Sequence, residues 1–188
     1  MTPDLWLKNG RKRPIWTDGS FAPYALDNGA WGAFNSGKPF DDELFMRAYA
    51  SLVGFADFVC IPDVVGDRES SLKKTESYLS RLPDCRKLVV VQDGMVESDI
   101  EPWLGEACGI AVGGTTDWKL SSLPMWSRLS KKVSCHLHVL RVNTKRRIWL
   151  AQGNGAHSID GTSVSLFPKS LDRLQRALSQ RDLFGGVS

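Results

Sequence analysis

The sequence predicts an α/β fold, a compact (β/α)8 TIM-type barrel with an abbreviated N-terminal part. Apolar runs alternate with helix-like stretches from about residue 56 onward, and this alternation indicates parallel β/α units. Each apolar run also ends in a polar residue or a glycine. The chain has 188 residues, whereas a typical barrel has roughly 250. We therefore expect tight loops and a single domain over residues 1–188; an open doubly wound sheet is the alternative.

Seven or eight strands are expected. Five of them have continuous apolar runs, which are typical of strands covered on both faces. These five are "FADFVCIPD" (55–63), "KLVVVQDG" (87–94), "CGIAVGG" (108–114), "VSCHLHVLRV" (133–142) and "AHSID" (156–160). Two earlier strands are expected in "RPIWTD" (13–18) and "YALD" (24–27).

Helices are expected between these strands and after the last one. Apolar residues near helical spacing predict an amphipathic helix over 68–82. Ser98 and Glu101 fit a capping box at the start of a short helix over 98–107. Further helices are expected over 123–132, 144–155 and 168–180.

The composition is that of a globular protein, with 42% hydrophobic and 24% charged residues. A net charge of +3 permits a polyanionic partner without requiring one. No signal peptide and no apolar run near the roughly 20 residues of a membrane span is visible, so we expect a soluble, cytoplasmic protein with no membrane partner. The cysteines are widely spaced and predict reduced core thiols; they are Cys60, Cys85, Cys108 and Cys135.

Polar residues and glycines close the expected strands. In a barrel of this type the active site lies at the carboxyl ends of the strands. Any one of these residues is explained as an ordinary turn former, but together they predict one rim of carboxylates, an amide and a glycine pair. The set is Asp27, Asp63, Gln92, Gly113, Gly114, Arg141, Asn143 and Asp160.

This set has a chemical logic. One carboxylate, one amide and a backbone N–H can read a planar heterocycle such as guanine, whose N1–H and exocyclic amine donate and whose O6 accepts. Two further carboxylates on opposite sides of a sugar carbon can act as nucleophile and acid/base, as in retaining glycosidases.

Several segments resemble the tRNA-guanine transglycosylase superfamily, and within it the small phage-type enzymes that place 7-deazaguanines into DNA. "LDNGAWGAF" is similar to the family's aspartate segment T/L-D-S-G-G-F, and "VVVQDG" to its I-V-Q-G-G. "GIAVGG" is similar to its Y-A-I/V-G-G, and "VCIPDVVGD" stands at its base-reading aspartate. The segment 138–161 is similar to the family's final strand, helix and strand, so the resemblance covers residues 25 to about 165.

The resemblance implies a glycosyltransferase that exchanges guanine in DNA for a free 7-deazaguanine base through a covalent glycosyl-aspartate. It implies that Asp160 is the nucleophile and Asp27 the acid/base. Asp18 in "RPIWTDGS" is a competitor to Asp27. The residues implied to bind the base are Asn28, Asp63, Gln92, Gly113 and Gly114.

The chain also departs from the family. Asn28 and Thr115 stand where the family usually has Ser and Leu. The cysteine-rich zinc site of the full-length enzymes has no counterpart after Asp160. We therefore expect no metal, no cofactor and no zinc-binding subdomain. A phage-encoded enzyme would work in the host-cell cytoplasm, and a further protein partner is unknown.

Basic residues near the expected rim predict contacts with a nucleic-acid backbone. "TKRR" follows a strand end and opens a helix, where backbone N–H groups also favour phosphate, and Trp16 or Trp31 could stack on a base. The residues expected to contact nucleic acid are Arg13, Arg141, Asn143, Lys145, Arg146 and Arg147.

Three other functions remain open from the sequence. The first is a non-catalytic nucleic-acid-binding subunit on the same fold, and the second a base-exchange enzyme acting on tRNA. The third is a metal-dependent barrel hydrolase that uses His136 and His138, which share one face of a strand in "HLH".

Overall fold

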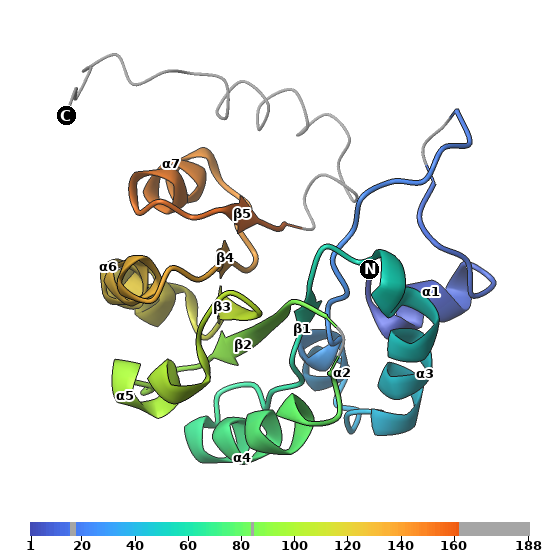
Figure 1. Cartoon of the computed structure of the whole chain (residues 1–188), viewed down its shortest axis with the longest axis horizontal. Coiled ribbons are helices and arrows are strands. Elements are labelled where there is room, and N and C mark those ends of the chain that lie inside the picture. Colours follow the sequence, from blue (N-terminus) through green and yellow to red (C-terminus); the bar gives the residue numbers. More distant parts are fainter. Residues whose placement is uncertain (16–17, 84, 162–188) are drawn as a thin grey trace.

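The described part of the chain forms one parallel sheet. The computed structural model describes residues 1–15, 18–83 and 85–161. Each strand pairs with the next strand along the chain, so the sheet has the order β1-β2-β3-β4-β5 (Figure 1). The strands are β1 (Val59–Cys60), β2 (Lys87–Val91), β3 (Cys108–Val112), β4 (Leu137–Val139) and β5 (Ser158–Ile159). These five confirm the strands expected after residue 54. Because the order never reverses, the doubly wound alternative is wrong for the described residues.

The prediction of a closed eight-stranded barrel is wrong. The described residues form an open five-stranded sheet that curls into half of a barrel. The segment 24–27 adds one parallel bridge, Leu26 to Val59, at the β1 edge. The described residues of the segment 13–18 contribute no strand to this sheet, because Ile15 pairs antiparallel with Phe21 in a separate hairpin. Curling brings the two sheet edges together at one end: Arg141, after β4, lies 4.0 Å from the ring centroid of Trp31, which follows the Leu26 edge.

Four helices follow the first four strands and lie along the outside of the sheet (Figure 1). Their positions confirm the expected β/α alternation. Helix α5 begins differently from the expectation: the Asp99 carboxylate accepts from the Val96 N–H at 2.8 Å, so Ser98 is not its cap. The helices are α4 (Arg68–Leu79), α5 (Glu97–Ile100), α6 (Thr116–Lys132) and α7 (Lys145–Gly153). The helix expected over 168–180 lies outside the described residues.

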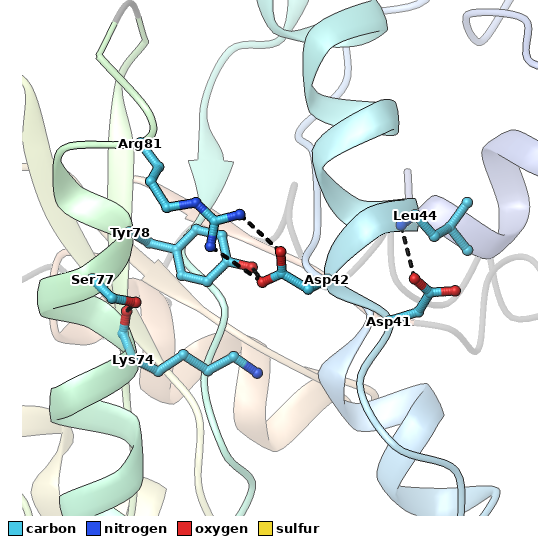
Figure 2. Close-up of polar contacts among 7 residues, drawn as sticks. All are labelled: Asp41, Asp42, Leu44, Lys74, Ser77, Tyr78 and Arg81. Carbon is cyan, nitrogen blue, oxygen red and sulfur yellow. Dashed lines mark hydrogen bonds and ion pairs between the residues drawn. The ribbon is translucent and has the colours of Figure 1, made fainter.

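Three helices that were not expected precede the sheet and lie beside β1 (Figure 1). Helix α3 is joined to α4 by the Asp42 carboxylate, which accepts from the Tyr78 hydroxyl and from Arg81 at 2.8 Å (Figure 2). The helices are α1 (Pro3–Lys8), α2 (Ala30–Asn35) and α3 (Asp42–Leu52), and two short 3-10 helices are η1 (Val53–Phe55) and η2 (Glu101–Trp103).

Both faces of the sheet are apolar. The outer face packs against the helices through residues such as Val89 and Ile110, and the inner face carries a second cluster of Phe58, Cys60, Leu88, Val90 and Ala111. Cys60, Cys108 and Cys135 are buried free thiols, as expected, and Cys85 is half-buried. Among the described residues, no helix has the length and apolar character needed to cross a membrane.

Candidate active site at the carboxyl edge of the sheet

The carboxyl ends of the parallel strands meet at one edge, and the structure brings most of the predicted site residues together there. Asp63 follows β1, Gln92 follows β2, Gly114 follows β3 and Asp160 follows β5. Asp27 follows Leu26, the residue that extends the sheet beyond β1. The hydrogen bonds described next connect these residues into two groups, a buried amide–carboxylate set and a carboxylate pair.

The amide–carboxylate set consists of Asn28, Asp63 and Gln92, all at most 5% exposed. Asn28 Nδ2 donates to Asp63 Oδ1 at 2.7 Å, and Gln92 Nε2 donates to Asp63 Oδ2 at 2.6 Å. The amide orientations are fixed from outside the set, because Asn28 Oδ1 accepts from the Ala30 N–H at 2.8 Å and Gln92 Oε1 from the Gly66 N–H at 3.3 Å. Each Asp63 oxygen keeps a lone pair for a ligand.

Burial raises the pKa of Asp63 to about 6, and the nearby Asp27 adds to this effect. The hydrogen bonds from Asn28 and Gln92 favour the ionised form, and so they act against this rise of the pKa. Asp63 is therefore mostly ionised at neutral pH. It can accept hydrogen bonds from a ligand that presents adjacent N–H groups.

The carboxylate pair is Asp27 and Asp160, which come from the two edges of the curled sheet. Burial raises the pKa of Asp27, and repulsion from Asp160 raises it further. Burial also raises the pKa of Asp160, but the Arg141 N–H, Lys119 and the Arg141 guanidinium all favour its ionised form. The pKa of both groups is raised, but the environments differ: the charge of Asp160 adds to the rise at Asp27, whereas Arg141 and Lys119 act against the rise at Asp160.

Arg141 occupies the centre of the site. Its backbone N–H donates to Asp160 Oδ1, and its guanidinium donates to the Gly114 carbonyl oxygen. The guanidinium also lies 4.0 Å from the ring centroid of Trp31, whose side chain is partly exposed and stacks with Phe34 at 5.8 Å. Arg141 thus contacts Asp160, Gly114 and Trp31 inside the site. Its contact with a nucleic-acid backbone stays a prediction.

The glycine pair after β3 meets tight contacts. A Cβ on Gly113 would lie 3.2 Å from Gln92 Nε2. Gly114 has φ +73°, and a Cβ there would lie 2.5 Å from Asp93 Oδ2 and 2.6 Å from Cε3 of Trp118. Neither position has free space for a side chain.

The basic residues expected to bind nucleic acid divide into two places. Lys145, Arg146 and Arg147 open α7 directly after the β4 end, with Thr144 as the cap, so they lie on the same edge as the carboxylates. Asn143 lies there too, beside Gly161. Arg13 lies elsewhere: its guanidinium sits between the rings of Phe21 and Phe55, at 3.6 and 3.7 Å. Phe55 precedes β1, so Arg13 is at the opposite end of the strands from Asp63.

The structure separates the two competing aspartates. Asp18 is exposed, and its carboxylate accepts from the Ser20 N–H at 2.9 Å and from the Ser20 hydroxyl at 2.6 Å. It is the turn residue of the hairpin that joins Ile15 to Phe21. Asp27, and not Asp18, lies beside Asp160. Trp16 lies outside the described residues.

The histidine pair faces the inner side of the sheet. His136 Nε2 and His138 Nδ1 each lie 2.7 Å from the Ser158 hydroxyl oxygen, and both rings pack against Phe58. Burial lowers the pKa of each of the two histidines to about 4, so both are neutral at pH 7. Within the described ranges, no group of three or more His, Cys, Asp or Glu side chains could hold a metal ion.

Lys119 is a site residue that was not predicted. It lies on α6, is 2% exposed and donates through Nζ to the Leu140 carbonyl oxygen. Burial and the charge of Arg141 lower its pKa to about 8, while Asp160 acts in the opposite direction. The sequence did contain a signal, because Lys119, Leu123 and Trp126 have helical spacing and form one buried stripe. A lysine in an apolar stripe is unusual.

A cavity of about 720 Å³ opens next to the site, between α1, α2 and the segment 38–44. Its lining reaches the site at Asn28 and Gly29 and does not include Asp27, Asp63 or Asp160. The cavity is therefore a neighbour of the carboxylates and does not enclose them.

Comparison with protein-family models and with curated proteins finds no match to this chain.

Proposed function

We propose that this protein is a base-exchange glycosyltransferase that replaces guanine in DNA with a 7-deazaguanine base. The observation that carries the proposal is the carboxylate pair Asp27 and Asp160, close enough to repel each other and adjacent to the set Asn28, Asp63 and Gln92. Two carboxylates suit double displacement at a sugar carbon. A neighbouring amide–carboxylate set suits the recognition of a purine edge.

The proposed reaction has two displacements. Asp160 attacks C1′ of the target nucleotide, which forms a C1′–O bond and breaks the C1′–N9 bond, and protonated Asp27 gives its proton to the departing guanine. The incoming 7-deazaguanine then loses its N9 proton to Asp27 and attacks C1′, and Asp160 leaves as a carboxylate. The assignment of roles follows the environments: Arg141 and Lys119 favour ionised Asp160, whereas burial and Asp160 favour protonated Asp27.

Base recognition is proposed to use the amide–carboxylate set and one aromatic ring. Asp63 accepts from the N1–H and the exocyclic amine of the base, and the second N–H of the Gln92 amide donates to O6. The partly exposed Trp31 supplies a stacking surface that Arg141 holds in place. The target base must leave the duplex stack to reach this edge, at a cost of a few kcal/mol.

The test is the covalent intermediate. Wild-type protein is incubated with duplex DNA that carries labelled guanine, and label release is scored with and without a 7-deazaguanine; the DNA–protein adduct is trapped by denaturation. We expect base-dependent release and an adduct in the wild type, loss of both in Asp160→Asn, and loss of turnover in Asp27→Asn. Asp117→Asn, an exposed aspartate on α6, is the matched control. Wild-type exchange by Asp160→Asn would show that the nucleophile is assigned wrongly.

A nucleic-acid-binding subunit is the second candidate, and one observation favours it. Trp149 is 47% exposed on α7, and the ammonium of Lys145 lies 4.4 Å from its ring centroid. An exposed aromatic ring beside basic residues can stack on a base without any catalysis. DNA binding without label release would favour this candidate, and release from labelled tRNA but not from DNA would favour the tRNA-acting alternative.

A further inference from the structure

One peptide group lies between the buried ammonium of Lys119 and the carboxylate of Asp160. The Leu140 carbonyl oxygen accepts from Lys119 Nζ. The N–H of the same peptide group, which belongs to Arg141, donates to Asp160 Oδ1. Cation, peptide and carboxylate therefore form one continuous hydrogen-bonded chain from α6 to the end of β5.

The ammonium group of Lys119 is buried without a direct ion pair among the described residues. The residue is 2% exposed, and within the described part of the chain its ammonium has no carboxylate partner at ion-pair distance and one hydrogen-bond acceptor, Leu140. Burying an ammonium without a close counter-ion is costly. The charge of the Asp160 carboxylate, at the other end of the peptide, favours the protonated form of Lys119.

The backbone at Arg141 is bent to complete the chain. Arg141 has φ +57°, a left-handed conformation that is unfavourable for a residue with a Cβ. This conformation accompanies the arrangement in which the Arg141 N–H meets Asp160 and the Leu140 carbonyl oxygen meets Lys119. A strained non-glycine residue in a functional edge is typical of a position whose orientation is required.

We propose that Lys119 is a positioning residue for Asp160 that acts through the Leu140–Arg141 peptide group. The ammonium polarises the peptide, and the polarised N–H makes a stronger hydrogen bond to the carboxylate. It thereby orients Asp160 and keeps it ionised. In the proposed base exchange, on which the activity part of this inference rests, Lys119 supports the nucleophile without touching the substrate.

Several other charges act on the same two groups. Asp160 faces Asp27 and the Met1 amino group from the opposite edge of the sheet, and the Arg141 guanidinium from its own. Lys119 faces the guanidinium groups of Arg141 and Arg147, which disfavour its protonated form. Removing the Lys119 charge leaves Asp160 beside Asp27 with less compensation, so the pKa of Asp160 must rise.

The experiment compares Lys119→Met and Lys119→Gln, which both remove the charge, with Lys119→Arg, which keeps it. Lys131→Met, an exposed lysine on the same helix, is the matched control. We expect the acidic limb of the single-turnover base-exchange profile to move to higher pH by about 1 unit in the two uncharged variants, the lower end of a close charge effect. The profiles of Lys119→Arg and Lys131→Met should match the wild type.

A second readout does not depend on the proposed function. The Asp160 carboxyl carbon is titrated by NMR, and we expect its main transition at higher pH in Lys119→Met and Lys119→Gln. In the wild type the same signal should show a second, smaller inflection near pH 8, where Lys119 loses its proton, and Lys119→Arg should lack it. An Asp160 titration that is unchanged in the uncharged variants, or a wild type without the second inflection, would overturn the proposal. A shifted titration without base exchange would refute the proposed function alone.

Discussion

The buried carboxyl group of Asp63 costs the protein stability. The pKa of Asp63 rises to about 6 from an ordinary 3.8. Since one pKa unit corresponds to about 1.4 kcal/mol, the ionised group destabilises the fold by roughly 3 kcal/mol at neutral pH. Because the pKa of Asp63 is higher in the folded protein than in the unfolded chain, this cost is absent below pH 3.8 and grows as pH rises toward 6. Buried carboxyl groups with such a cost are typical of functional sites.

Substitution of Asp63 tests the reading of the base. In Asp63→Asn one oxygen becomes an NH2 group, which must face a donor, because the Ala30 and Gly66 N–H groups fix the orientations of the Asn28 and Gln92 amides. The variant also loses an acceptor for the base. An unmade hydrogen bond to a buried group costs about 1–3 kcal/mol, so we expect binding of a free 7-deazaguanine to weaken about 5- to 150-fold, measured by calorimetry.

The controls separate recognition from folding. The circular dichroism spectrum of Asp63→Asn should match that of the wild type, and Asp117→Asn should bind the free base with wild-type affinity. Unchanged affinity in a folded Asp63→Asn protein would remove Asp63 from the base-binding set.

At this scale the sequence predicted the aspartates better than the cations. Asp27, Asp63 and Asp160 were found because each follows an apolar run, and parallel strands bring such positions to one edge. Lys119 was missed because it lies inside a helix, not at a strand end. Arg13 was misplaced because charge in a sequence does not reveal to which end of a strand a hairpin folds.

Among the elements, the turn from β3 into α6 is constrained by hydrogen bonds and by close contacts at Gly114. The Thr115 N–H donates to Asp93 Oδ2 at 2.7 Å and so fixes the start of α6, the helix that carries Lys119. Gly114 lies in the turn between β3 and α6 and has φ +73°. Its carbonyl oxygen accepts a hydrogen bond from the Arg141 guanidinium. The turn therefore controls both the helix and the centre of the site.

Gly114→Ala tests this constraint. The added Cβ would meet Asp93 Oδ2 at 2.5 Å and the Trp118 ring at 2.6 Å, in a backbone conformation that alanine adopts at a cost. We expect the free energy of unfolding, measured by chemical denaturation, to fall by at least about 2 kcal/mol. The matched control is Gly54→Ala, where a Cβ would meet nothing within 4 Å. Equal stability of the two variants would show that the turn tolerates a side chain.

Element prediction depended on the length of the pattern. The five strands of the sheet were found from runs that are apolar on both faces. Helices α1 and α2 have six residues each, fewer than two turns, so they leave little periodicity to detect. Helix α3 was missed although Phe45, Ala48, Tyr49 and Leu52 form its buried stripe. The segment 13–18 was assigned as a strand of the sheet, but Asp18 and Gly19 form the turn of a hairpin instead.

For the whole molecule, the alternation of strands and helices predicted the winding direction but not the closure. The alternation of strands and helices predicts that successive strands are parallel and adjacent, and the observed order confirms this. Closure depends on strand number and tilt, which are properties of the complete sheet. The described chain reaches a curled half-barrel whose edges approach each other at the site, through Arg141 and Trp31 and through Asp27 and Asp160.

Helix α3 is joined to α4 by a polar junction and an aromatic contact. Tyr78 on α4 is 1% exposed, packs edge-on against Phe45 of α3 at 5.6 Å and donates its hydroxyl to Asp42 (Figure 2). Arg81 completes the junction from the solvent side, where it and Asp42 are each at least 40% exposed. Because α2 lies between α3 and Asp27 in the chain, this junction also supports the segment that carries half of the carboxylate pair.

Tyr78→Phe should therefore destabilise the protein more than Arg81→Met does. Phenylalanine keeps the contact with Phe45 but removes the hydrogen bond to a charged acceptor, worth about 1.5–3 kcal/mol; since Asp42 is half-exposed and water can replace the hydroxyl, we expect a loss of about 1–2 kcal/mol. An exposed ion pair contributes about 0–1 kcal/mol, so Arg81→Met should cost less. Urea denaturation measures both, and hydrogen exchange should show faster opening of α3 in Tyr78→Phe. A larger loss in Arg81→Met would mean that the ion pair, and not the tyrosine hydroxyl, holds α3 against α4.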